Sequence, residues 1–194
     1  MFDPKPNHHT HPSTATVGMW LFLASLSMLF AATILGYVVI RIRGAGSAAM
    51  GTIQLPRALW LSTAIMLGGS FTIHRAVQAI RLERQLLLRR YLEMTCVLAA
   101  AFLCVQGPSL AMLLMEHRRA ALQGIALYGL VFFLILVHAL HVVGGVIGLG
   151  VTTMRARQGR YDHEHYAGVK HAAMYWHFLD VVWVIMFMSM FIAG

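Results

Sequence analysis

Five long apolar runs, separated by short polar segments, constrain this 194-residue chain more than any other feature. A helix needs about 20 mostly apolar residues to cross the hydrocarbon layer of a bilayer. The runs that reach this length cover residues 17–40, 56–80, 91–115, 123–154 and 171–192. Each run is continuously apolar and does not alternate, which predicts membrane helices rather than the strands of a barrel.

Composition supports a membrane protein and argues against a nucleic-acid-binding one. Hydrophobic residues make up 59% of the chain and charged residues only 11%, whereas a soluble domain carries about a quarter charged residues. The formal net charge is +8, but the basic residues stand in short clusters between the apolar runs. Such clusters are typical of contacts with phospholipid headgroups, so we expect no nucleic-acid partner.

The loops between the runs are too short to hold a soluble domain. We therefore expect a polar N-terminal tail over residues 1–16 and a single transmembrane domain over residues 17–194. Short loops make consecutive helices antiparallel neighbours. The predicted fold class is an all-α membrane protein, a bundle of five transmembrane helices in which Gly107-Pro108 interrupts the third.

The distribution of Lys and Arg predicts the orientation of this bundle, because basic residues are enriched on the cytoplasmic side. One side of the membrane would hold Lys5, Arg75, Arg81, Arg84, Arg89, Arg90, Arg155, Arg157, Arg160 and Lys170. The other side would hold only Arg41, Arg43, Arg57, Arg118 and Arg119. We therefore expect the N-terminus in the cytoplasm and the C-terminus outside.

Three histidines and one aspartate lie well inside the last two runs, where an Asp near the centre of a membrane helix costs about 2.5–3.5 kcal/mol. His138 and His141 are three residues apart and share one helical face, as do His177 and Asp180. Three interpretations compete. These groups can satisfy one another between two helices, His138 and His177 can be axial ligands of a b-type haem, or the histidines and Asp180 can bind a metal. A proton relay is a further alternative.

Other features near these residues suggest packing rather than catalysis. Tyr175, Trp176 and Trp183 surround the same helix, and ordinary interface packing explains them. The sequence contains no P-loop, no Cys-x-x-Cys, no Gly-x-Ser-x-Gly and no His-Glu-x-x-His motif. We therefore do not expect the chain to be an enzyme on its own.

The motifs of four helices resemble those of one membrane-protein family. Residues 175–183, YWHFLDVVW, resemble the YWHFVDVVW signature of subunit III of haem–copper respiratory oxidases, the cytochrome c oxidase subunit III family. The stretch FFLILVHALHVVGG resembles that family's FHGxHVxxG helix, and STAIMLGGSFT its NTxxLLxSGxT helix. Phe102 and Gln106 match an FxxxQ pattern, and GMWLFLAS is similar to the opening helix.

The resemblance implies the short, five-helix form of this family, an accessory subunit in a bacterial inner membrane. Such a subunit has no haem, metal or catalytic residue of its own. It packs against catalytic subunit I, which carries haem and copper, and beside subunit II. It holds phospholipid and supports proton uptake and aerobic electron transport. Lipid or subunit contacts would then involve His138, His141, Tyr175, Trp176, His177, Asp180 and Trp183. Two alternatives stay open: a free-standing cytochrome b, and a nitric oxide reductase-associated member of the family.

The chain departs from the family pattern at three carboxylates. Leu26 stands where short-form members carry an acid after Ser25, Ser109 replaces the acid of a QxxE pattern, and Lys170 replaces a Glu before the last signature. Any proton-transfer role that rests on those acids cannot be carried over to this chain.

Overall fold

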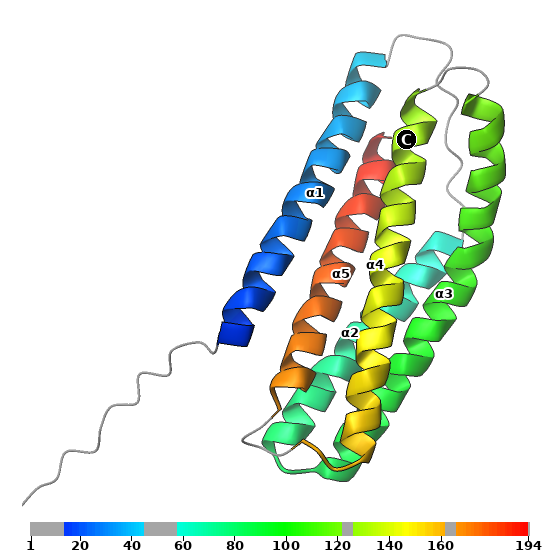
Figure 1. Cartoon of the computed structure of the whole chain (residues 1–194). Helices are drawn as coiled ribbons and strands as arrows, with labels where there is room; N and C mark the ends of the chain where they lie inside the picture. Colours follow the sequence, from blue (N-terminus) through cyan, green and yellow to red (C-terminus); the bar gives the residue numbers. More distant parts are fainter. Residues whose placement is uncertain (1–13, 45–57, 122–125, 162–165, 194) are drawn as a thin grey trace, which may run out of the picture.

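The computed structural model describes residues 14–44, 58–121, 126–161 and 166–193, and all five apolar runs form helices (Figure 1). The helices are α1 (Thr14–Gly44), α2 (Ala58–Arg81), α3 (Gln85–Ala121), α4 (Ala126–Arg157) and α5 (Ala167–Ala193). The helical prediction is therefore confirmed for every run. The predicted break in the third run is wrong, because α3 continues through Pro108.

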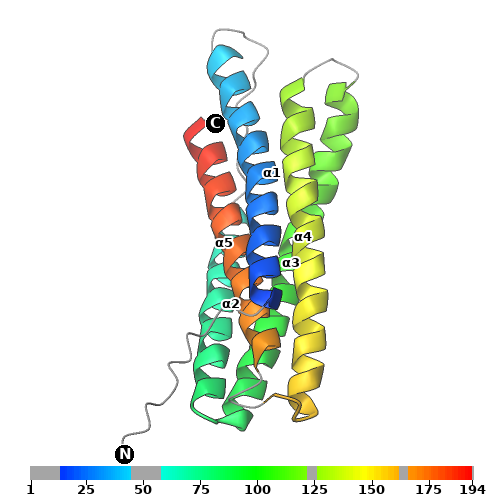
Figure 2. The same cartoon turned by 60° about the vertical axis from the view of Figure 1, so that its left-hand side comes forward.

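Helices α2, α3, α4 and α5 surround a common core, and α1 lies outside them. Contacts join α2 to α3, α3 to α4, α4 to α5 and α5 back to α2. Helix α1 packs only against α4 and α5 among the described residues. Consecutive helices run in opposite directions, and α1 begins near the end at which α5 also begins (Figures 1 and 2). This arrangement places α4 and α5 at the centre of the molecule.

Two tight helix ends produce the reversals on one side of the bundle. After α2, the chain turns at Glu83, which has a φ of 56°, and the Arg84 amide donates to the carbonyl of Ala79 at 2.9 Å. After α4, Gly159 has a φ of 70° and the Arg160 amide donates to the carbonyl of Arg155. A left-handed residue followed by such a bond is the usual way in which a helix ends before a reversal.

Three helices in the described part of the chain are long and apolar enough to cross a membrane: Thr14–Arg43, Phe132–Arg157 and Ala167–Ser189. The chain is therefore a membrane protein. Helices α2 and α3 are not among these candidate spans in the described part of the chain. Five helices are thus established, whereas five membrane spans stay a prediction.

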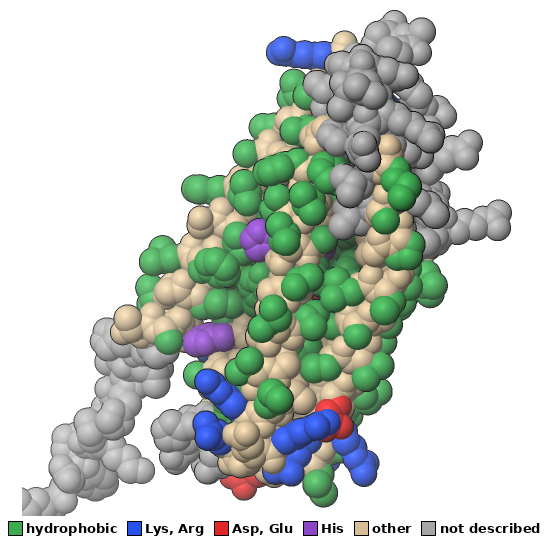
Figure 3. Space-filling view, turned by 45° about the vertical axis from the view of Figure 1, so that its right-hand side comes forward, with side chains coloured by type: hydrophobic (Ala, Val, Ile, Leu, Met, Phe, Trp, Pro, Cys, Tyr) green, Lys and Arg blue, Asp and Glu red, His purple; other side chains and the backbone are tan. Residues whose placement is uncertain are grey.

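Side-chain burial is consistent with this environment. One buried cluster centres on Phe30, Met66 and Trp183, and a second lies nearer the α2–α3 turn around Leu92 and Trp176. Many large apolar side chains point outward instead, and they form the hydrophobic band in Figure 3. Lys and Arg gather at one end of that band (Figure 3). This end is formed by the last turns of α2 and α4 and the first turns of α3 and α5.

Candidate functional site

The seven residues singled out from the sequence lie on α4 and α5, and four of them are buried inside the chain. The exposed fractions are 2% for His138, 1% for Trp176, 5% for Asp180 and 3% for Trp183. His141, Tyr175 and His177 are partly buried. The four buried residues contact other helices of the same chain. The contact with lipid or with another subunit stays a prediction, and it suits the three partly buried residues better.

His177 is held by α2. Its Nδ1 lies 2.5 Å from the hydroxyl oxygen of Ser70, and its ring centroid is 6.2 Å from that of His74. His74 in turn hydrogen bonds to the side-chain amide of Gln78 at 3.1 Å. A string of polar side chains therefore connects the middle of α5 to the exposed surface of α2 near the basic end.

Asp180 does not have the polar partners that a buried acid is expected to need. Neither carboxylate oxygen forms a hydrogen bond within the described residues. Ser70, whose hydroxyl is hydrogen bonded to His177, lies beside the carboxyl. The sequence-based interpretation in which the histidines and Asp180 satisfy one another is therefore not what the structure shows.

His138 faces a different set of neighbours. Its ring stacks on the indole of Trp183 with centroids 5.4 Å apart, and it forms a T-shaped pair with Phe30 with centroids 6.1 Å apart. The indole nitrogen of Trp183 donates to the hydroxyl of Thr63 at 3.0 Å. His138 lines a small cavity with α3 that His177 does not line. This separation gives no support to a haem held between His138 and His177.

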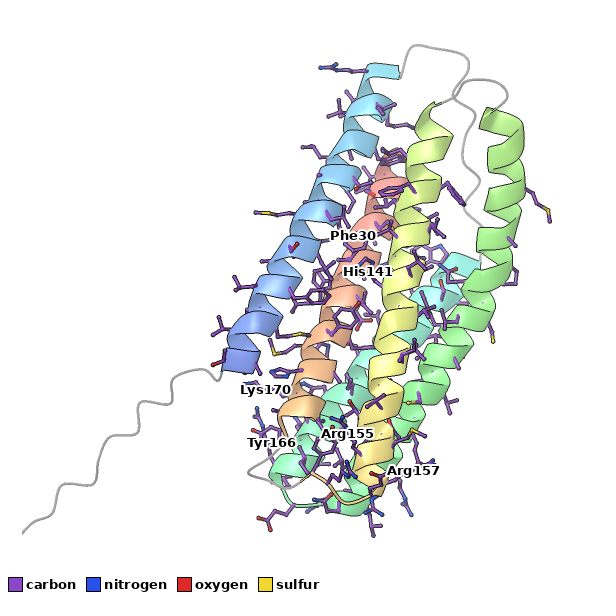
Figure 4. The ribbon with its side chains drawn as sticks, in the orientation of Figure 1. Phe30, His141, Arg155, Arg157, Tyr166 and Lys170 are labelled. Carbon is purple, nitrogen blue, oxygen red and sulfur yellow. The ribbon has the colours of Figure 1, made fainter. Side chains whose placement is uncertain are left out.

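His141 and Tyr175 join α4 to α5 and α1. The hydroxyl of Tyr175 donates to the carbonyl oxygen of His141 at 3.0 Å, and His141 itself donates to the carbonyl of Val137 at 2.7 Å. The ring of Phe30 on α1 lies edge-on to His141 with centroids 5.5 Å apart, and the two are labelled in Figure 4. These contacts fix α1 against the centre of the bundle.

A groove of about 440 Å³ opens between α1, α4 and α5. It lies between these contacts and the basic end of the bundle. Its wall on α4 is formed partly by glycines, which leave room because they lack side chains. A side chain at Gly148 would meet nothing within 4 Å, whereas one at Gly145 would lie 3.0 Å from Leu179 and Tyr175. Gly145 therefore permits close helix packing, while Gly148 lines the groove. Lys170 and Arg155 are seen at the basic end of the same helices (Figure 4).

The described residues do not form a metal centre. No group of three or more His, Cys, Asp or Glu side chains comes together among them. Of the three positions where family acids are replaced, Leu26 is buried and Lys170 is exposed. The side chain of Ser109 lies outside the described residues.

Comparison with known proteins identifies the family. The sequence model described as "Cytochrome c oxidase subunit III" matches residues 6–194. The chain belongs to the cytochrome c oxidase subunit III family. It is 30% identical to cytochrome c oxidase subunit 3 of Thermostichus vulcanus over 95% of this chain and 90% of that relative. It is 29% identical to the Synechocystis subunit 3 over 95% of this chain and 78% of that protein.

Residues outside the seven predicted ones complete the site in this member of the subunit III family. Thr63 accepts from Trp183, Ser70 contacts His177, and Gln106 lines the same small cavity as His138. All three stand at positions where this sequence matches the family motifs. The motif matches therefore pointed to these three residues, but the sequence alone did not indicate which side chains they contact.

Proposed function

We propose that the chain is an accessory subunit of a bacterial haem–copper oxidase in the inner membrane. It packs against catalytic subunit I, beside subunit II, and these partners carry the haem and copper. The observation that carries this proposal is the family match over residues 6–194, together with relatives that are named as oxidase subunits. Its part in aerobic electron transport is to stabilise the catalytic subunit and to support proton uptake.

We further propose that all five helices cross the membrane, with the N-terminus in the cytoplasm and the C-terminus in the periplasm. The antiparallel order of the helices supports this topology. It brings to one end of the bundle the basic residues that the positive-inside rule assigns to the cytoplasm. These are Arg81, Arg84, Arg89, Arg90, Arg155, Arg157, Arg160 and Lys170.

Co-purification tests the assignment. The full chain, tagged and extracted in mild detergent, is expected to bring with it a larger haem-bearing polypeptide with a Soret band. Denaturing electrophoresis then shows whether the haem travels with the partner. A chain that purifies alone and without haem contradicts the accessory-subunit proposal. A chain that purifies alone with a Soret band lost in His138→Ala would instead establish the cytochrome b alternative.

The groove between α1, α4 and α5 is the proposed site for phospholipid. It is apolar along most of its wall, and His171 lines it at the end where Lys170 stands on the same helix. Apolar walls suit an acyl chain, and basic side chains near the membrane surface attract anionic headgroups. Tyr175 lines the groove as well, which supports its predicted role as a lipid contact.

Two matched substitutions test this lipid site. Gly148→Leu fills the groove, whereas Gly150→Leu adds the same side chain at a position that does not line it. A β-carbon at either glycine meets nothing within 4 Å, so the two positions are matched in the space next to the backbone. We expect only Gly148→Leu to reduce the phosphatidylglycerol that is retained after detergent washing. Equal retention in the two variants would contradict the site.

A further inference from the structure

A second cavity, of about 160 Å³, lies between α3, α4 and α5 and is separate from the lipid groove. Apolar side chains form most of its wall, including Phe102, Leu103 and Ile135. Two polar side chains also line it, Gln106 from α3 and His138 from α4. Its volume is far above the roughly 10–15 Å³ that one water molecule needs.

Both side chains carry polar atoms that are buried without hydrogen-bond partners in the described part of the chain. His138 is 2% exposed, and neither of its ring nitrogens forms a hydrogen bond within the described residues. The side-chain oxygen of Gln106 is also buried and also has no partner there. A neutral imidazole presents one donor and one acceptor, and leaving such groups unpaired costs about 1–3 kcal/mol each. The cavity therefore adjoins several unmet hydrogen-bonding groups.

The rings packed against His138 do not meet this need. Trp183 stacks on the face of the imidazole, and its only donor is already taken by Thr63. Phe30 is an apolar ring that lies in a T-shaped arrangement with His138 and offers it no hydrogen-bonding group. Among the described residues that line the cavity, the other unpartnered polar atom is the side-chain oxygen of Gln106, on the neighbouring helix.

The backbone of α3 adds a further acceptor at the same level. Pro108 lies inside the helix and has no amide hydrogen, so the carbonyl of Cys104 lacks its usual helical donor. Cys104 lies between Leu103 and Gln106, both of which line the cavity. In membrane helices, backbone groups freed by proline are commonly satisfied by side chains or ordered water.

We propose that this cavity is a water-binding site in which ordered water bridges Gln106 on α3 to His138 on α4. The water supplies the hydrogen bonds that His138 lacks and fastens the two helices together beside the proline. This inference rests on side chains of this chain alone, so it does not depend on the proposed oxidase partner.

Hydroxyl-radical footprinting by X-ray radiolysis tests the site, because radicals form at buried water and modify the side chains next to it. The probe is bulk and bound water in the full chain within its native membrane. We expect Trp183, which lines the cavity, to be modified despite its burial. Ala139→Leu, which fills the cavity, should lower that modification several-fold and leave Trp176, which does not line it, unchanged. A Trp183 that is unmodified, or insensitive to Ala139→Leu, would overturn the proposal by showing a dry cavity.

A double-mutant cycle tests the bridge itself. Gln106→Leu and His138→Phe should each lower the unfolding midpoint, and the double variant should lose no more than the worse single one. Such coupling is expected when two side chains share one bridging partner. Additive losses would show that the two residues act separately and would contradict the bridge. If either variant fails to fold, the footprinting of the wild-type chain still decides whether water is present.

Discussion

The indole of Trp176 on α5 occupies the space that a side chain at Gly69 on α2 would need. A β-carbon at position 69 would lie 3.1 Å from the indole nitrogen and 3.5 Å from two ring carbons. Trp176 is almost fully buried, so the rigid ring has little room to move away. The contact of α2 with α5 therefore depends on the absence of a side chain at this glycine.

Gly69→Ala is expected to destabilise the bundle. Overpacking against a buried ring costs about 1–3 kcal/mol, which exceeds the gain of about 1 kcal/mol when Ala replaces Gly in a helix. The net loss should appear as a lower midpoint of thermal unfolding in detergent. Gly18→Ala is the control, since a β-carbon there meets nothing within 4 Å and should raise the midpoint slightly. Equal shifts in the two variants would show that Trp176 yields easily.

Thr63→Val tests the hydrogen bond from Trp183. The substitution keeps the shape of the side chain but removes the hydroxyl that accepts from the indole nitrogen at 3.0 Å. A buried N–H without a partner costs about 1–3 kcal/mol, so the free energy of unfolding should fall by that order. Thr33→Val is the matched control, because the Thr33 hydroxyl is exposed and bonds only within its own helix. Its effect should be much smaller, as measured by unfolding in increasing denaturing detergent.

The helices were predictable from the sequence, whereas their rotations were not. Runs of about 20 apolar residues fix where helices form, and their continuity makes helices the only suitable elements. A helix that is apolar on all sides, however, does not indicate which side chains face a neighbour. The pairs Thr63–Trp183 and Ser70–His177 depend on those rotations, so only the structure shows them.

Asp180 and Gly148 illustrate the same limit at single positions. The spacing of Asp180 from His177 predicted a shared network, but the network between α2 and α5 passes through Ser70 and His74 instead. The spacing of Gly144 and Gly148 is typical of close helix packing, yet a side chain at Gly148 would meet open space. The space at Gly148 depends on the position of α1 relative to α4. No local pattern in the sequence encodes that position.

The turn between α2 and α3 offers a stabilising substitution. Glu83 has a φ of 56°, a conformation that costs about 1–2 kcal/mol for residues with a β-carbon. Glu83→Gly removes this cost but adds about 0.4–1 kcal/mol of backbone entropy in the unfolded chain. We expect a net gain on the order of 0.5 kcal/mol, seen as a small rise in the unfolding midpoint.

Gly159→Ala provides the opposite test of the same principle. Gly159 has a φ of 70° at the end of α4, and alanine there should lower the free energy of unfolding by about 1 kcal/mol. The loss should be seen as a lower unfolding midpoint. If both substitutions shift the midpoint in the same direction, backbone conformation does not limit stability at these helix ends.

Two arginine contacts at the basic end should differ in strength and in their response to salt. The side-chain Nε of Arg89 donates to the carbonyl of Ala156, in the last turn of α4, at 3.1 Å in a partly buried setting. A cation at a helix C-terminus contributes roughly 0.3–1 kcal/mol, so Arg89→Met should lower the free energy of unfolding by that order. Arg157 instead pairs with Glu93 at 2.8 Å, with side chains 63% and 41% exposed. Exposed ion pairs contribute little, so Glu93→Gln should have almost no effect.

Unfolding measured at low and high salt separates the two contacts. Raising the salt from 0.1 M to 1 M shortens the Debye length from about 10 Å to about 3 Å and so weakens the attraction between exposed charges. Any small effect of Glu93→Gln should therefore shrink further at high salt. The hydrogen bond from Arg89 to a backbone carbonyl is only partly exposed to solvent, and its loss should persist. A large effect of Glu93→Gln at high salt would contradict this ranking. It would indicate that the Arg157–Glu93 pair is shielded from water in the membrane, either by lipid or by a neighbouring subunit.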